Sequence, residues 1–183
     1  MIRCAVGQAV CQRPNSVFPK TIFATGTDEL RLNLTGVFVD LEDEAITFVA
    51  TDANRLVKVV RSDVKPGVKH SFILPKKALN LLKSSLMGAS VPVKIDYNRS
   101  NAFFTFGDTK LVCRFIDEKY PDYNGVIPKE NPNILVMNRE DLYNSVKRIS
   151  IYSNKSTHQI RVKLAGSELS ISAEDFDLSN EAI

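Results

Sequence analysis

The sequence predicts an α+β fold in which antiparallel β-hairpins alternate with single amphipathic helices. Alternating apolar and polar residues, interrupted by polar turns, predict three hairpins at residues 32–50, 91–106 and 160–173. Helical spacing predicts one helix over residues 76–86 and another over residues 138–151. Each strand carries its apolar residues on one face, so one side of each sheet is expected to be buried and the other to face solvent.

The first hairpin begins where Leu32, Leu34 and Gly36 alternate with polar residues and lead into the run 37–39. An acidic loop separates this strand from a second strand at residues 46–50. The other two hairpins repeat the pattern, with these apolar residues on one face of each strand: Val91, Val93, Ile95 and Tyr97 before Phe104 and Phe106, then Ile160, Val162 and Leu164 before Leu169, Ile171 and Ala173.

The helix predicted at residues 76–86 has an apolar side and a basic side. The apolar side contains Ala78, Leu79, Leu81, Leu82 and Leu86, and the other contains Lys76, Lys77, Asn80, Lys83 and Ser84. A lysine face without acidic residues can follow a phosphate backbone without reading its sequence. A solvated amphipathic helix explains the same pattern, and composition alone favours that explanation.

The second helix starts at Asn138, a favourable N-cap residue with Asp141 three positions later. Between the two helical regions, residues 117–133 contain three prolines and a glycine, which exclude a helix or a central strand. We therefore expect a domain boundary there. The segments DELRLNLTGVF…ITFVATD and HQIRVKLAG…LSISAED echo each other on the two sides of this boundary. A repeated helix-plus-hairpin unit explains the echo, and neighbouring units are expected to pack together.

Composition places the chain among ordinary globular proteins. It has 183 residues, 44% of them hydrophobic and 25% charged, with a net charge of +3 that permits contact with DNA without demonstrating it. Cys4, Cys11 and Cys113 are scattered, which argues against a disulfide framework or a zinc site. No apolar run approaches the roughly 20 residues of a membrane span. We expect a soluble, cytoplasmic protein with no membrane contact.

The sequence offers little support for an enzyme. His70 and His158 are its only histidines, and neither has the spacing of a metal-binding pair. The acidic residues Asp40, Glu42, Asp43 and Glu44 lack the spacing and the glycine of a calcium loop, which favours a solvated hairpin turn. We therefore expect no catalytic residue, no metal and no cofactor. A metal-dependent nuclease is the least favoured alternative.

Four stretches taken together resemble the bacterial DNA sliding clamp, the beta subunit of DNA polymerase III. They are DELRLNLTGVF (28–38), FVATDANRLV (48–57), FILPKKALNLL (72–82) and FIDEKYPDYNGVIPK (115–129), and the likeness extends over roughly residues 16–183. The resemblance implies a DNA-clamp fold, with helices on one face of curved antiparallel sheets. It also implies that residues 16–132 are most of the middle domain and residues 133–183 the first half of the third, while residues 1–15 stay unassigned.

The resemblance further implies a DNA polymerase processivity factor. In this family two subunits close head to tail into a ring around double-stranded DNA, which the ring encircles without sequence specificity. A hydrophobic pocket between the middle and third domains docks the DNA polymerase III alpha subunit, the clamp loader and repair proteins. On this basis the chain is part of a longer homodimeric parent, and by itself it is not expected to close a ring. The alternative is a peptide-binding adaptor with no DNA role of its own.

Matching motifs carry the family's sites onto this sequence. The peptide-binding pocket is implied at Leu34, Thr51, Ala53, Asn54, Arg55, Leu56, Pro121 and Val126, and the DNA-facing surface at Lys76 and Lys77, followed by Lys83, Arg31 and Asn33. Two positions depart from the family pattern. Asn54 replaces a histidine that is common in the family, which changes the rim of the pocket. Gly125 stands where a basic residue is common.

Overall fold

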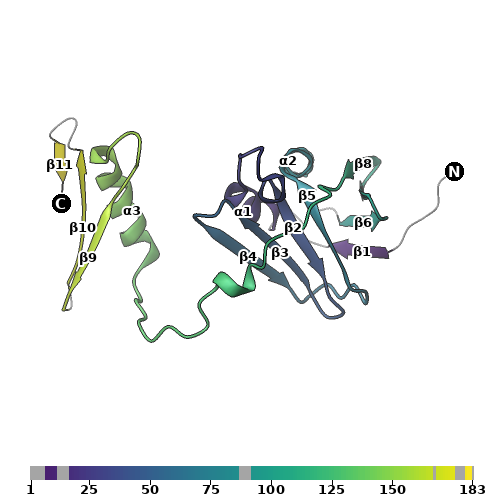
Figure 1. The fold of residues 1–183 in the computed structure, drawn as a ribbon, viewed down its shortest axis with the longest axis horizontal. Helices are drawn as coiled ribbons and strands as arrows, with labels where there is room; N and C mark the ends of the chain where they lie inside the picture. Colours follow the sequence, from purple (N-terminus) through teal and green to yellow (C-terminus); the bar gives the residue numbers. More distant parts are fainter. Residues whose placement is uncertain (1–6, 12–16, 87–91, 167, 176–179, 183) are drawn as a thin grey trace. The chain divides into compact units, whose positions relative to one another are not determined.

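A computed structural model describes residues 7–11, 17–86, 92–166, 168–175 and 180–182 (Figure 1). The chain divides into two compact units, unit 1 (Met1–Ile127) and unit 2 (Pro128–Ile183).

The described residues of unit 1 form two four-stranded antiparallel sheets. The first has the order β4-β3-β2-β5, and its strands are β2 (Gly36–Leu41), β3 (Ile46–Thr51), β4 (Leu56–Arg61) and β5 (His70–Pro75). The second has the order β1-β6-β7-β8, and its strands are β1 (Gly7–Cys11), β6 (Val93–Tyr97), β7 (Asn101–Phe106) and β8 (Thr109–Arg114). The strand β1 lies in a segment for which the sequence pattern predicted no element.

Two helices lie in the described part of unit 1, one after β1 and one after β5 in the sequence. The short helix α1 (Phe18–Thr21) continues into a 3-10 turn at Ile22–Ala24, and α2 (Lys76–Ser85) begins directly after β5. A strand–helix–three-strand pattern thus occurs twice, and the first strand of each half pairs with the sheet of the other half (Figure 1). This exchange of β1 and β5 ties the two halves of unit 1 into one domain.

The main core of unit 1 lies between the helices and the sheets. Leu79, Leu82 and Leu86 are at most 1% exposed and belong to the same apolar cluster as Phe18 and Phe48. The Phe18 and Phe48 rings meet edge to face, with their centroids 6.1 Å apart. Burying each leucine contributes about 1.5–3 kcal/mol, which fixes α2 on the sheet.

Two expectations for unit 1 are wrong. Leu81 was placed on the apolar side of α2, but its side chain is 56% exposed, because it lies about 200° around the helix from Leu79. Residues Leu32–Leu34 form a 3-10 turn rather than the start of the strand. Thr35 closes this turn, since its Oγ1 donates to the Leu32 carbonyl over 2.8 Å. Val91, which was expected to open a strand, lies outside the described residues.

Unit 2 contains the helix α3 and a small sheet of order β11-β10-β9. Asn138 caps α3 (Arg139–Ile149) as predicted, with its Oδ1 accepting from the backbone N–H groups of Glu140 and Asp141 over 2.8 and 3.4 Å. The strands are β9 (Arg161–Ala165), β10 (Glu168–Asp175) and β11 (Asn180–Ala182). A 3-10 turn at Ser150–Tyr152 replaces the last predicted helical residues.

The core of unit 2 covers only one strand of its hairpin. Ile149 of α3 is buried with Ile171 and Ala173 of the central strand β10. The prediction that the apolar face of β9 is also buried is wrong, because Val162 is 49% exposed and Leu164 is 60% exposed. β9 is an edge strand, and the residues of α3 pack on β10.

Candidate functional site

Five of the expected pocket residues lie in or next to the turn from β3 to β4. Thr51 ends β3, and its Oγ1 donates to the Arg55 carbonyl over 2.7 Å and accepts from the Ala53 N–H over 3.1 Å. Asp52 Oδ1 accepts from the backbone N–H groups of Asn54 and Arg55 over 3.0 and 2.9 Å. Side chains that bond their own backbone favour such turns. The sequence ATDANRL therefore builds this turn from local contacts.

The same contacts hold Arg55 in place. Its Nε donates to Asp52 Oδ2 over 2.9 Å, and its guanidinium lies 5.8 Å from the centroid of the Phe23 ring. The backbone N–H of Arg55 is the main cause that lowers the pKa of Asp52, so the carboxylate keeps its charge to a lower pH than an ordinary aspartate does. Ala53 has a φ of 77°, a strained value for a residue with a Cβ, which these hydrogen bonds maintain.

Leu34 and Leu56 belong to a second apolar cluster of unit 1. Leu34 is buried there with Val49, Ile73 and Tyr120, and Leu56 is half-buried against them. Phe38 stacks on the Tyr120 ring, with centroids 4.7 Å apart and an interplanar angle of 12°. The cluster forms an apolar floor beside the β3–β4 turn.

Hydrogen bonds and a cation–π contact fasten the segment after β8 to this cluster. The Asn33 side-chain amide donates to the Lys119 carbonyl over 3.0 Å. Lys58 Nζ lies 5.2 Å from the centroid of the Tyr123 ring and bonds Asn124 Oδ1 over 3.4 Å. The two expected pocket residues of this segment, Pro121 and Val126, are exposed. The structure thus places Leu34 and Leu56 in one apolar cluster and joins Thr51 to Arg55 by a hydrogen bond. Pro121 and Val126 lie at the surface.

Tyr120 also belongs to this site, although it was not among the expected pocket residues. It is 8% exposed, and burial raises the pKa of its hydroxyl to about 12, an effect that the backbone of Thr51 partly offsets. Among the described residues its hydroxyl has no partner at standard hydrogen-bond geometry. The signal for Tyr120 was its place in the sequence Tyr-Pro-Asp-Tyr.

The expected DNA-facing lysines lie along α2. Lys76 is half-buried, while Lys77 and Lys83 are exposed, and within the described part of the chain none of the three forms an ion pair. Lys76 and Lys77 also line a groove of about 640 Å³ between α2 and residues 26–35. Asn80 and Ser84, which the sequence placed on the same side of the helix, also line this groove, and sequence reasoning missed its other polar residues, Thr27, Glu29 and Thr35.

The two remaining DNA-facing candidates are engaged with other residues. Arg31 Nε lies 3.0 Å from Asp28 Oδ2, in an exposed ion pair three residues apart. The Asn33 amide is bonded to Lys119, as described above. The structure therefore brings Lys76 and Lys77 together in the groove and gives Arg31 and Asn33 local structural contacts.

No group of three or more His, Cys, Asp or Glu residues within the described ranges is arranged to hold a metal ion. In the same ranges, no helix combines the length and the apolar character needed to cross a membrane.

Comparison with known proteins gives the family. Residues 12–122 match the family model described as DNA polymerase III beta subunit, central domain, which covers more than half of the chain. The chain belongs to this family. The resemblance of the four sequence motifs to the DNA polymerase III beta subunit is thereby confirmed.

Two curated relatives are both named beta sliding clamp. The protein of Synechococcus elongatus is 28% identical over 171 residues, which are 89% of this chain and 46% of that protein. The protein of Chlamydia trachomatis is 27% identical over 163 residues, which are 88% of this chain and 39% of that protein. The chain thus spans less than half the length of these two relatives.

Solved structures of the family have the same fold. The DNA polymerase sliding clamp of Pseudomonas aeruginosa matches with a TM-score of 0.91 at 24% identity, over 100% of this chain and 51% of that one. The sliding clamp (DNA polymerase III subunit beta) of Bartonella birtlesii, bound to griselimycin, matches with a TM-score of 0.90 at 26% identity, over 100% and 50%. The predicted α+β clamp fold is confirmed.

Proposed function

We propose that this chain is part of a DNA sliding clamp, a processivity factor and non-catalytic subunit of a cytoplasmic replicative polymerase. Its parent forms a homodimeric ring that encircles double-stranded DNA without sequence specificity. Residues 16–132 supply most of the middle domain and residues 133–183 the first half of the third. The pocket around Leu34 and Arg55 docks the DNA polymerase III alpha subunit, the clamp loader and other proteins with a clamp-binding motif.

Besides membership of the family, the observation that best supports this proposal is the lysine face of α2. Lys76 and Lys77 adjoin the groove, Lys83 follows on the same helix, and α2 has no acidic residue. Lysines on a helix surface attract phosphates, because binding releases counterions from the DNA, and such contacts read no bases. A clamp needs this property, because it must slide past every sequence.

Reversing the charge of Lys76 and Lys77 is expected to weaken non-specific DNA binding about tenfold. Each lysine that neutralises a phosphate contributes about 0.9 to the slope of log affinity against log salt concentration. The double variant K76E/K77E should therefore lower the slope by about 2. Fluorescence anisotropy of a labelled 20-base-pair duplex, titrated with this chain from about 50 to 200 mM salt, measures both quantities.

The matched control is K94E/K110E, which makes the same change in net charge on β6 and β8. It should leave most of the affinity and the slope in place. Equal losses in the two double variants would show that binding is diffuse and that α2 is no DNA-facing surface. If the chain shows no salt-dependent binding to DNA but still binds peptide, the adaptor without a DNA role is favoured.

The pocket is suited to a short apolar peptide. Leu34 and Leu56 supply the floor, and Thr51 and Arg55 supply polar groups at its edge. A peptide with adjacent leucine and phenylalanine side chains is expected to bind weakly and to shift the NMR amide signals of residues 51–56. Arg55→Ala should weaken binding about fivefold, since it removes about 1 kcal/mol of contact. Arg99→Ala, at another hairpin turn of unit 1, should change it little, and a titration without shifts in residues 51–56 would contradict the proposed pocket.

A further inference from the structure

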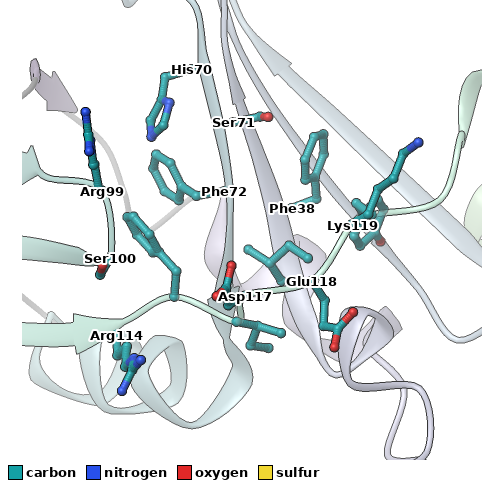
Figure 2. Close-up of a pocket in the computed structure, with 14 residues that line it drawn as sticks. Phe38, His70, Ser71, Phe72, Arg99, Ser100, Arg114, Asp117, Glu118 and Lys119 are labelled. Carbon is teal, nitrogen blue, oxygen red and sulfur yellow. The ribbon is translucent and has the colours of Figure 1, made fainter.

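A second hollow of unit 1 has no role in the proposed function. It has a volume of about 390 Å³ and lies between β5 and the segment after β8 (Figure 2). Its lining includes Ser71 of β5, Arg99 and Ser100 of the β6–β7 turn, and Arg114 at the end of β8. A hollow of this size admits a few residues of peptide.

One wall of this hollow is an open sheet edge. β5 is the outer strand of its sheet, and the Ile73 carbonyl accepts from the Ile116 N–H over 3.0 Å in an isolated bridge. The backbone of Ile73 therefore points outward. Because outward positions alternate along an antiparallel strand, the N–H and C=O groups of Ser71 point the same way. Ser71 is exposed, and among the described residues no neighbour outside the β2–β5 ladder bonds its backbone. An incoming extended chain meets both a donor and an acceptor there.

Stacked aromatic rings border the open edge on two sides. Phe72 stacks on Phe115, with centroids 4.4 Å apart and an interplanar angle of 15°, and Phe38 stacks on Tyr120 on the other side of Ile73. All four rings line the hollow. The aromatic walls offer apolar surface to side chains that alternate along an extended segment.

The charges around the hollow favour an acidic occupant. Three cations line it, Arg99, Arg114 and Lys119, against the two acids Asp117 and Glu118. In the described ranges none of the three cations forms an ion pair. Figure 2 shows Arg99 and Arg114 on the same side of Phe72, with Arg99 above Ser100 and Arg114 below it in this view. A carboxylate that enters from solvent therefore meets a net positive charge.

We propose that this hollow binds a short extended segment of a partner protein, which joins the free edge of β5 at Ser71 and carries an acidic side chain toward Arg99 and Arg114. The mode is strand addition, in which main-chain hydrogen bonds supply affinity and the neighbouring pockets supply selectivity. The groups that contact this segment, at Ser71, Arg99 and Arg114, lie outside the pocket at Leu34 and Arg55, so a second partner can be held by unit 1 through a different surface.

A five-residue peptide blocked at both ends, with alternating threonine and valine around a central glutamate, tests this inference on the whole chain. In an NMR titration we expect shifts of the amide signals of Ser71, Ser100 and Ile116 and none in residues 51–56. A lysine in place of the glutamate should weaken binding at least about fivefold. A peptide N-methylated at the residue opposite Ser71 should lose most of its binding, because one main-chain hydrogen bond is blocked.

Variants of the chain complete the test. R99E/R114E should abolish the preference for glutamate over lysine, while the control K94E/K110E should preserve it. Ser71→Pro removes the outward N–H at an edge position where proline is tolerated, and it should weaken binding severalfold without changing the circular dichroism spectrum. Equal binding of the lysine and glutamate peptides, equal binding of the N-methylated peptide, or the same shifts with free glutarate would each overturn the proposal.

Discussion

Gly36→Ala is expected to destabilise unit 1 by about 2–3 kcal/mol, although it adds a single methyl group. Gly36 opens β2 opposite Pro75. A Cβ at this position would lie 2.5 Å from the Leu74 carbonyl oxygen, 2.7 Å from Ile73 Cγ2 and 2.9 Å from Ile116 Cδ1. The first of these atoms belongs to the backbone of a paired strand, so relief requires β5 to move away from β2. Urea unfolding followed by circular dichroism measures the loss.

Gly36→Ala should also weaken the isolated bridge between Ile73 and Ile116, because the added Cβ would crowd both residues. Hydrogen exchange of the Ile116 amide is therefore expected to speed up more than exchange in β7. Gly125→Ala is the control, because the nearest atom to its added Cβ is Asp122 Oδ2 at 3.6 Å. It should change the free energy of unfolding by less than about 0.5 kcal/mol. Equal stability of the two variants would show that β2 and β5 separate without cost.

The fold was predictable where a strand or helix buries one face of a regular pattern. Apolar and polar residues alternate with a period of two on both sides of a turn within residues 93–106, and β6 and β7 form there with three residues between them. Asn138 marks the start of α3, since the cap is a contact between near neighbours. Leu32 and Leu34 show the limit of this reasoning. Their alternation resembles a strand, but a 3-10 turn forms there, in which the Leu34 N–H donates to the Arg31 carbonyl and Thr35 Oγ1 donates to the Leu32 carbonyl.

The candidate site likewise has one part that follows from local sequence and another that depends on long-range contacts. The turn from Thr51 to Leu56 is held by contacts within five residues, so its shape follows from its sequence. The contact between Asn33 and Lys119 joins positions 86 residues apart, and no periodicity indicates it. The hollow beside Ser71 was not predicted, because Arg99 and Arg114 come to line one hollow only through the pairing of Asn101 with Arg114. Long-range register is information that composition and spacing do not contain.

Tyr120→Ala is expected to lower the free energy of unfolding by about 3–5 kcal/mol. Tyr120 is 8% exposed, stacks on Phe38 and joins Leu34, Val49 and Ile73 in the second apolar cluster. Removing the ring leaves a cavity under both the proposed peptide pocket and the hollow beside β5. Peptide binding at both sites should therefore weaken, and thermal unfolding of the variant measures the loss of stability.

Tyr120→Phe keeps the ring and removes the hydroxyl, so it measures the contribution of the hydroxyl alone. The hydroxyl lacks a standard hydrogen bond within the described residues, so this variant should be about as stable as the original chain near pH 7. Burial raises the pKa of Tyr120 to about 12 from an ordinary value of 10.0. Between these values the unfolded chain has lost the proton and the folded chain keeps it, so stability falls as pH rises. Over this pH range the free energy of unfolding falls by about 2–3 kcal/mol, and Tyr120→Phe should abolish this fall.

Cys113 provides the control for this alkaline effect. Burial raises the pKa of its thiol to about 11 from 9.0, so its contribution to stability falls over a lower pH range than that of Tyr120. Cys113→Ala should therefore flatten the profile mainly between about pH 9 and 11, and Tyr120→Phe mainly between about pH 10 and 12. An unchanged profile in Tyr120→Phe would mean that the phenol reaches solvent in the folded chain. The apolar floor beneath Leu34 and Arg55 would then be open to water, which would also count against the proposed docking of apolar peptides there.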